Sequence, residues 1–168
     1  MGLKIVVGIV CALLCVPLFV WGAWRLYEYR WYSGIIPEPL GISYSIEIGG
    51  ESGLREGCGA AIFRMDEATA RKIIERGPRY LARAMVSRGH HDSYHTFFGW
   101  KKTPFVSGNA HGESTGLSPG LDCASIDPAL QWKITDALRA PGAYYTHGPE
   151  TFLLVDPAAR LIVLTYFG

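Results

Sequence analysis

Residues 5–24 form the longest uncharged segment of this 168-residue chain, and no other feature restricts the possible folds as strongly. A helix of these 20 residues would be about 30 Å long, which matches the hydrocarbon core of a bilayer. The segment therefore predicts an N-terminal transmembrane helix, with residues 1–32 forming a membrane anchor and its interfacial collar. The collar is aromatic and basic, as is typical of a membrane interface, and comprises Arg25, Tyr27, Tyr29, Arg30, Trp31 and Tyr32.

A cleaved signal peptide is the alternative interpretation of the same segment. Val20 and Gly22 are small enough to precede a cleavage before Ala23, but 20 residues exceed the usual apolar length of about 7–15 in a signal peptide. We therefore favour an uncleaved signal anchor. Lys4 and the short N-terminal tail favour a cytoplasmic N-terminus, although Arg25 and Arg30 oppose it. The prediction is a single-pass protein of the cytoplasmic membrane with an exported, periplasmic C-terminal domain.

Gly8 and Ala12 lie four residues apart inside the predicted membrane helix. Small residues at this spacing allow two membrane helices to approach closely, so this face is a candidate contact with a partner helix. The alternative is that small residues are simply common in membrane helices.

Prolines and glycines at residues 33–39 predict a linker, after which residues 40–168 form a single domain. Apolar residues alternate with polar ones over residues 42–48, which is typical of a half-buried strand. Acidic residues precede two helical patterns as candidate N-caps, Asp66 and Asp127. We therefore predict an α+β domain with a mainly antiparallel sheet and two to three helices. Strands are expected at 42–48, 58–65, 94–100, 143–147, 151–155 and 161–166, helices at 67–76, 79–87 and 127–138, and a long loop at 102–124.

Cys58 and Cys123 are the two cysteines outside the apolar segment. In an exported domain they are candidates for one disulfide, because oxidising compartments permit such bonds. The alternative is two buried thiols that behave as small apolar residues.

Histidines cluster in residues 89–95, around Asp92. His91 and His95, with His111 or else His147 as a third ligand, are the candidate metal site, because neutral imidazole is a common ligand and a carboxylate can complete the set. The alternative, which we favour, is a loop of solvated histidines, since no metal-binding motif accompanies them. The sequence thus indicates no cofactor.

Residues 112–116 contain the letters G-x-S-x-G around Ser114, with Asp122 and His147 following in the order found in some hydrolases. That motif requires a strand before the serine and a helix after it. Neither pattern is present here, so the motif is not taken as a nucleophile site.

Charge is segregated although the formal net charge is only +1. Residues 71–102 contain eight Lys and Arg residues and two acidic ones. Lys72, Arg76, Arg79 and Arg83 follow each other at helical spacing and form a candidate surface for an anionic partner. The alternative is a solvated helix face. The near-neutral total excludes a bulk nucleic-acid binder.

These observations favour a membrane-anchored binding or accessory protein that acts by protein–protein contact, such as an inhibitor, an immunity protein or a subunit of a membrane complex. No small-molecule ligand is assigned to it. The alternative is a small hydrolase or a metal-dependent enzyme that uses the histidines near residues 90–111.

Overall fold

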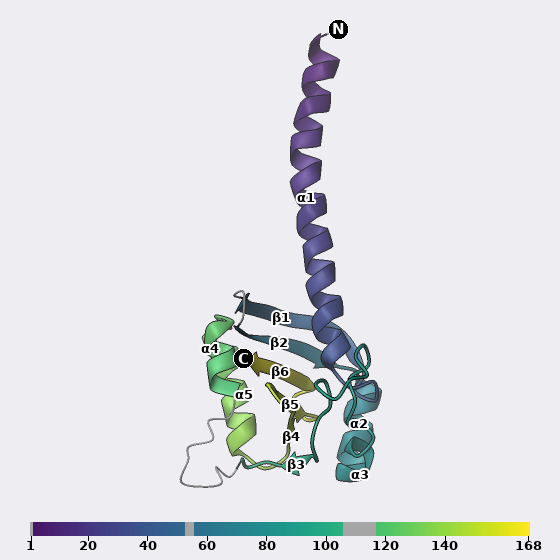
Figure 1. Ribbon diagram of the computed structural model, residues 1–168, viewed down its shortest axis with the longest axis vertical. Coiled ribbons are helices and arrows are strands. Elements are labelled where there is room, and N and C mark those ends of the chain that lie inside the picture. Colours follow the sequence, from purple (N-terminus) through teal and green to yellow (C-terminus); the bar gives the residue numbers. More distant parts are fainter. Residues whose placement is uncertain (1, 53–55, 106–116) are drawn as a thin grey trace.

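A computed structural model describes residues 2–52, 56–105 and 117–168, with the side chains of the first helix described from residue 13 onward. Helix α1 (Gly2–Ile35) extends away from a rounded α+β domain and joins it only at its C-terminal end (Figure 1). The domain contains one six-stranded sheet in which neighbouring strands are antiparallel. The predicted α+β class and antiparallel sheet are confirmed.

The predicted membrane-spanning helix over residues 5–24 is contradicted. In the part of the chain that the structure describes, no helix combines the length and the apolar character needed to cross a bilayer. In α1 the apolar sequence described from residue 13 ends at Trp24, because Arg25, Glu28 and Arg30 follow it. Three further predictions depended on that helix, and the same finding contradicts them: the signal anchor, the single-pass placement in the cytoplasmic membrane and the periplasmic location of the domain.

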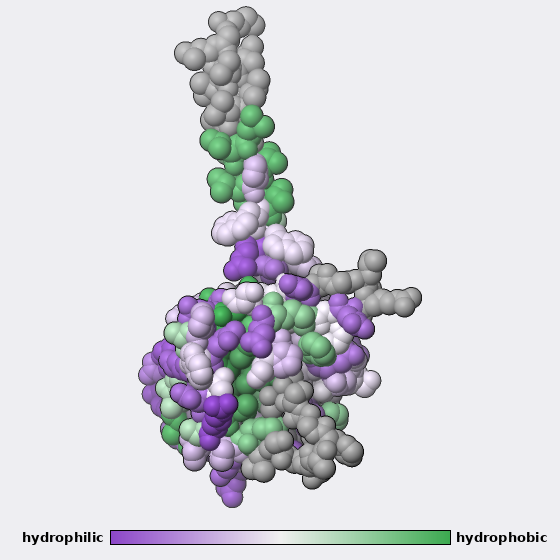
Figure 2. Space-filling model, turned by 90° about the vertical axis from the view of Figure 1, so that its left-hand side faces the viewer, coloured by the Kyte–Doolittle hydropathy of each residue, from purple (hydrophilic) through white to green (hydrophobic). Residues whose placement is uncertain are grey.

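The described part of α1 nevertheless carries exposed apolar side chains beyond the domain. Leu13, Phe19 and Trp21 are each more than half exposed. Figure 2 shows this apolar section above a more hydrophilic section where the helix meets the domain. The predicted contact residues Gly8 and Ala12 lie on α1, but their side chains fall outside the described residues.

The strand order of the sheet is β1-β2-β6-β5-β4-β3, so that the first and third strands are the two edges. The hairpin of β1 and β2 and the hairpin of β5 and β6 pair directly with each other through β2 and β6. The strands are β1 (Ile42–Ser52), β2 (Gly57–Met65), β3 (Lys101–Lys102), β4 (Tyr144–His147), β5 (Thr151–Asp156) and β6 (Leu161–Phe167).

Side chains alternate across the central strands, so each face of the sheet builds its own apolar core. Phe63, Leu153 and Leu164 lie on one face, beneath α2 (Glu67–Arg76), α3 (Pro78–Leu81) and the C-terminal end of α1. Ile62, Leu154 and Val163 lie on the other face, beneath α4 (Leu117–Cys123) and α5 (Pro128–Arg139). Figure 1 shows these two sets of helices on opposite sides of the sheet.

Both predicted N-caps are confirmed. The Asp66 carboxylate accepts from the backbone N–H of Thr69 at 2.7 Å, and Asp127 accepts from the N–H groups of Ala129 and Leu130. Each cap satisfies N–H groups that have no partner inside the helix. The predicted break between 67–76 and 79–87 occurs at Gly77, which has a φ of 51°. The second helix ends at Leu81 rather than near residue 87.

The number of helices is higher than predicted, because α4 lies inside the segment that we expected to be a loop. Leu117 and Leu121 are buried on the sheet, one helical turn apart. Gly120 lies so close to the sheet that a Cβ would be 2.6 Å from Cβ of Thr165. Glycine at position 120 therefore allows the helix to pack closely against the sheet, and it does not indicate a loop.

Two predicted strands differ from the structure. In β1, register shifts next to Tyr44 and Ser45 disturb the alternation, so Tyr44 and Ile46 are exposed and Ile48 is buried. The predicted strand at 94–100 is wrong. The backbone N–H of Phe97 donates to the carbonyl of Met85. Phe98 makes a single backbone bond to His147 of β4, and the regular pairing with β4 begins at Lys101–Lys102.

Candidate functional site

A cavity of about 460 Å³ lies where the C-terminal end of α1 meets the sheet and the loop around residue 95. This volume is in the range of small-ligand pockets. Segments far apart in the sequence contribute to its walls. The lining residues are Trp24, Tyr27, Glu28, Trp31, Tyr32, Ile35, Gly50, Glu51, Gly57, Tyr94, His95, Glu150, Thr151, Tyr166 and Gly168.

Helix α1 contributes one aromatic face to this pocket. Trp24, Tyr27, Trp31 and Ile35 follow at three- and four-residue spacing, which places them on one side of a helix. The ring centroids of Trp24 and Tyr27 are 5.9 Å apart, and those of Tyr27 and Trp31 are 6.4 Å apart. Residues that we predicted to be an interfacial collar thus line a pocket. Their helical spacing was the signal that could have identified them.

Tyr32 and Tyr166 join α1 to the sheet at the pocket wall. Their rings stack with centroids 5.8 Å apart, and their hydroxyl oxygens are 2.9 Å apart. Burial and the hydrogen bond to Tyr166 both raise the pKa of Tyr32 well above its ordinary value. Tyr32 therefore presents a neutral hydroxyl group near neutral pH.

The loop that follows α3 is held against the end of α1 by side chains that bond to backbone carbonyls. The Arg88 guanidinium donates to the carbonyls of Ile36 at 3.1 Å and Leu40 at 2.6 Å, and it also reaches Pro37. The Ser87 hydroxyl donates to the carbonyl of Ile35 at 2.7 Å. Burial lowers the pKa of Arg88, but a guanidinium ionises so far above neutral pH that it stays charged. These bonds fix the start of the loop that carries the histidines.

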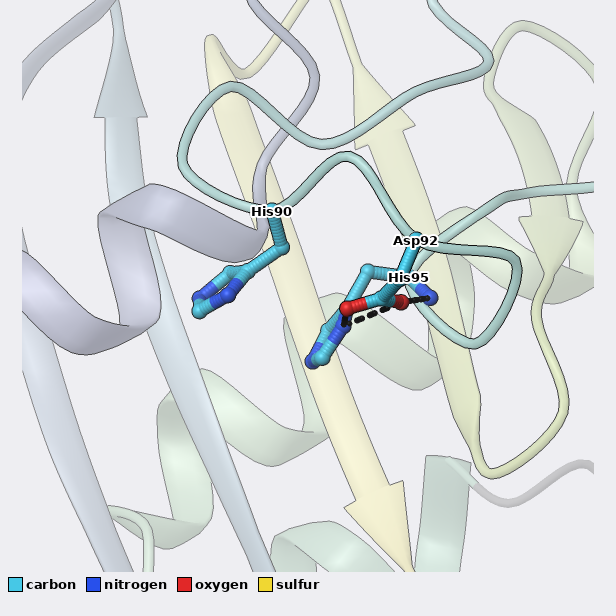
Figure 3. Close-up of side chains that lie close together, drawn as sticks. All are labelled: His90, Asp92 and His95. Carbon is cyan, nitrogen blue, oxygen red and sulfur yellow. Dashed lines mark hydrogen bonds and ion pairs between the residues drawn. The ribbon is translucent and has the colours of Figure 1, made fainter.

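His90, Asp92 and His95 converge on this loop (Figure 3). Their ligand atoms all lie within 4.8 Å of one another. The Asp92 carboxylate accepts from the backbone N–H of His95 at 2.9 Å and contacts its ring Nδ1 at 2.8 Å. The rings of His90 and His95 stack with centroids 4.2 Å apart, and His90 also contacts Trp31.

The backbone N–H of His95, followed by its ring, holds the pKa of Asp92 below the ordinary value. Asp92 is therefore a carboxylate at neutral pH. Because a carboxylate can only accept, the proton between the two groups sits on Nδ1 of His95.

The charges of the pocket lining are mostly negative. Glu28, Glu51 and Glu150 are carboxylates, His95 is the one imidazole, and no Lys or Arg is part of the lining formed by the described residues. Glu28 pairs with Arg25 outside the lining at 3.1 Å, and Glu150 accepts a hydrogen bond from the Tyr94 hydroxyl. The pocket thus combines aromatic walls with acidic groups.

The predicted metal residues are not brought together as a set. His95 belongs to the cluster, whereas His91 is exposed and His90 takes the place we assigned to it. His111 lies outside the described residues, as does Ser114 of the hydrolase-like motif. The loop conformation decides which histidine turns toward Asp92, and sequence spacing alone does not contain that information.

The remaining candidate residues lie away from the pocket. Lys72, Arg76, Arg79 and Arg83 are all exposed, and none of them lines it. Cys58 and Cys123 form a disulfide between β2 and the end of α4, with Cα atoms 5.9 Å apart.

Comparison with known proteins identifies no relative of this chain: no protein-family model, curated protein or solved structure matches it. The site therefore has to be interpreted from its own chemistry.

Proposed function

We propose that this protein is a binding protein whose pocket receives a positively charged side chain of a partner protein. The observation that carries the proposal is the lining itself, in which six aromatic rings accompany three carboxylates. The proposal keeps the protein–protein contact expected from the sequence, but it moves the contact from the basic surface to an acidic, aromatic pocket.

Charge complementarity favours a cation as the occupant. A guanidinium or ammonium group is attracted to the face of Trp, Tyr or Phe within about 6 Å of the ring centroid, and the attraction increases when the cation loses water. Trp24, Tyr27 and Trp31 line the pocket along one helix face, and Glu51 and Glu150 add negative charge from the sheet side. Arginine is the better occupant of the two basic side chains, because its planar group both stacks on rings and bonds to carboxylates in a fork.

The proposal is tested by calorimetric titration of the full chain with N-acetylarginine amide. N-acetylcitrulline amide is the matched control, because it has nearly the same shape and no charge. We expect binding of the arginine compound and binding of the citrulline compound that is at least several-fold weaker. Equal affinity for both compounds, or no binding of either, would overturn the proposal.

Variants locate the binding within the chain. Trp31→Ala removes a ring from the pocket, while Trp132→Ala removes a ring that is 66% exposed on α5 and lies outside the pocket lining. Glu51→Gln removes a negative charge from the pocket, and its control is Glu75→Gln, because Glu75 is exposed on α2 and lies outside the pocket lining. We expect several-fold weaker binding for the two pocket variants and no change for the two controls. The same loss in pocket and control variants would contradict this location.

A further inference from the structure

We infer that His90, Asp92 and His95 form a binding site for one divalent transition-metal ion, beside the pocket and independent of the proposed partner. The inference rests on the distances within the cluster and on the kind of ligand that each residue offers. The site shares His95 with the pocket lining, but its other two ligands lie outside the lining, and binding of the ion requires no occupant in the pocket.

The ligand set points to zinc or a similar late first-row ion. Imidazole suits Zn²⁺, Cu²⁺, Ni²⁺ and Fe²⁺, whereas Mg²⁺ and Ca²⁺ prefer a shell made only of oxygen. Two histidines and one carboxylate are a known zinc set, in which the fourth position is left to water or another ligand. We choose Zn²⁺ as the ion to test.

The existing contact between Asp92 and His95 provides the place for the ion. Nδ1 of His95 lies 2.8 and 3.0 Å from the two carboxylate oxygens. Ligands about 2.0–2.1 Å from a tetrahedral zinc are separated from one another by roughly 3.3 Å. An ion can therefore replace the shared proton after a small widening of this contact, and His95 then carries its proton on Nε2.

His90 supplies the third ligand after a limited movement. Its ligand nitrogen is within 4.8 Å of the other two ligand atoms, so a contraction of about 1.5 Å brings it into range. The stacked rings, 20° from parallel, have to open so that both nitrogens point at the ion. The backbone of this segment is held in place, because Gly89 N–H donates to the carbonyl of Gly34 at 2.9 Å and Arg88 bonds to residues 36–40.

The site is pre-organised at Asp92. Its carboxylate accepts from the His95 backbone N–H, and its carbonyl accepts from the Thr96 hydroxyl at 3.0 Å, so a tight turn joins two of the three ligands. Because these two ligands lie on one tight turn, metal binding costs less conformational entropy than it would if both side chains were free to move. The third ligand then closes the site across the loop.

The experiment is a titration of the full chain, prepared without a histidine tag, with Zn²⁺ alone in the presence of a competing chelator. We expect one ion per chain. His90→Ala and His95→Ala should each weaken binding by more than the roughly 10–100-fold that is typical of losing an outer-shell partner. Asp92→Asn should weaken it as well. His91→Ala is the matched control, because His91 is exposed and lies next to the cluster without belonging to it.

Unchanged Zn²⁺ affinity in the His90 and His95 variants, an equal loss in the His91 variant, or no binding by the parent chain would each overturn the inference. The less disruptive substitution His90→Asn, with circular dichroism of every variant, separates loss of a ligand from loss of folding. Because the titration contains no arginine compound, its failure leaves the proposed function standing, and failure of the arginine titration leaves the metal site standing.

Discussion

The two faces of the sheet are covered in different ways. Two regular helices, α4 and α5, cover one face, with Asp127 capping α5 and a disulfide joining α4 to β2. On the other face, α2, α3 and the C-terminal end of α1 share the covering with residues 82–100, which contain no helix and no named strand.

The pocket adjoins the face with the irregular covering, because Ile35 of its lining belongs to the apolar core of that face. A helix satisfies most of its own backbone groups, so it can cover a sheet with apolar side chains alone. The irregular segment depends on side-chain bonds to backbone carbonyls: Trp100 and Ser87 donate to Ala84 and His95 within it, and Arg88 donates to Leu40 beyond the end of α1. Polar groups therefore gather on this face, where the segment carries the clustered histidines and contributes Tyr94 and His95 to the pocket lining.

The largest expected effect concerns the helical face. Replacing Cys58 and Cys123 by serine opens a loop closed over 65 residues, and the chain-entropy relation assigns such a loop about 4 kcal/mol of stability. We expect the free energy of unfolding in urea to fall by about this amount, and addition of a reductant to the parent chain should have the same effect. A loss below about 1 kcal/mol would show that the disulfide contributes little to this face.

The next effect concerns the irregular segment. Arg88→Met keeps the length of the side chain but removes the bonds to three carbonyls, and hydrogen bonds from charged groups contribute about 1.5–3 kcal/mol. We expect a loss of about 2 kcal/mol in urea unfolding, together with faster amide exchange at residues 87–96. Arg83→Met, at an exposed position, is the control and should be neutral. If the two variants unfold alike, side-chain bonds do not hold this segment.

Helix caps allow a balanced comparison of the two faces. Asp66→Ala and Asp127→Ala each remove an N-cap, which is usually a loss of about 1 kcal/mol. Each carboxylate accepts two hydrogen bonds, but the Asp66 variant should lose slightly more, because its bonds from Thr69 are partly buried whereas those of Asp127 are exposed. Thermal unfolding of both variants measures the difference. A larger loss for the Asp127 variant would reverse this order.

The smallest expected effect is a pH dependence of the histidine loop. The pKa of Asp92 is lowered by the His95 backbone N–H and then by its ring, so the folded state favours the carboxylate. This stabilisation is present above the ordinary pKa near 3.8 and is lost as the pH falls through the lowered value. An NMR titration of the Asp92 carboxyl carbon should show the lowered midpoint, and His95→Ala should shift it back toward the ordinary value. A midpoint that is not lowered in the parent chain would contradict the contact.

Local signals in the sequence predicted the parts of the fold that depend on local chemistry. Asp66 and Asp127 stand before helices as N-caps, and the strands expected at 151–155 and 161–166 occur as the antiparallel pair β5 and β6. The α4 helix was missed because its serine, proline and glycine disguise the burial of Leu117 and Leu121, which depends on contact with the distant strands β2 and β6.

The candidate site depended on information that the sequence contains only indirectly. The aromatic residues of α1 fit either a membrane-interface collar or the wall of a pocket. Contacts with distant residues, such as that of Tyr32 with Tyr166, distinguish the two interpretations, and the sequence does not show these contacts. The histidine segment was recognised, but the structure groups His90 with His95, where the sequence favoured His91. Which histidine lies beside His95 depends on the turn around Asp92 and on the packing of His90 against Trp31.

The most direct test of the account is an NMR titration of the tryptophan side-chain N–H signals with N-acetylarginine amide. The chain has five tryptophans, of which Trp24 and Trp31 line the pocket and Trp132 lies on the surface of α5. We predict that the signals of Trp24 and Trp31 shift in a saturable way, that the Trp132 signal does not, and that the citrulline compound leaves all of them in place. Absence of a shift at Trp24 and Trp31, or the same shift with the citrulline compound, would contradict a pocket for a positively charged side chain.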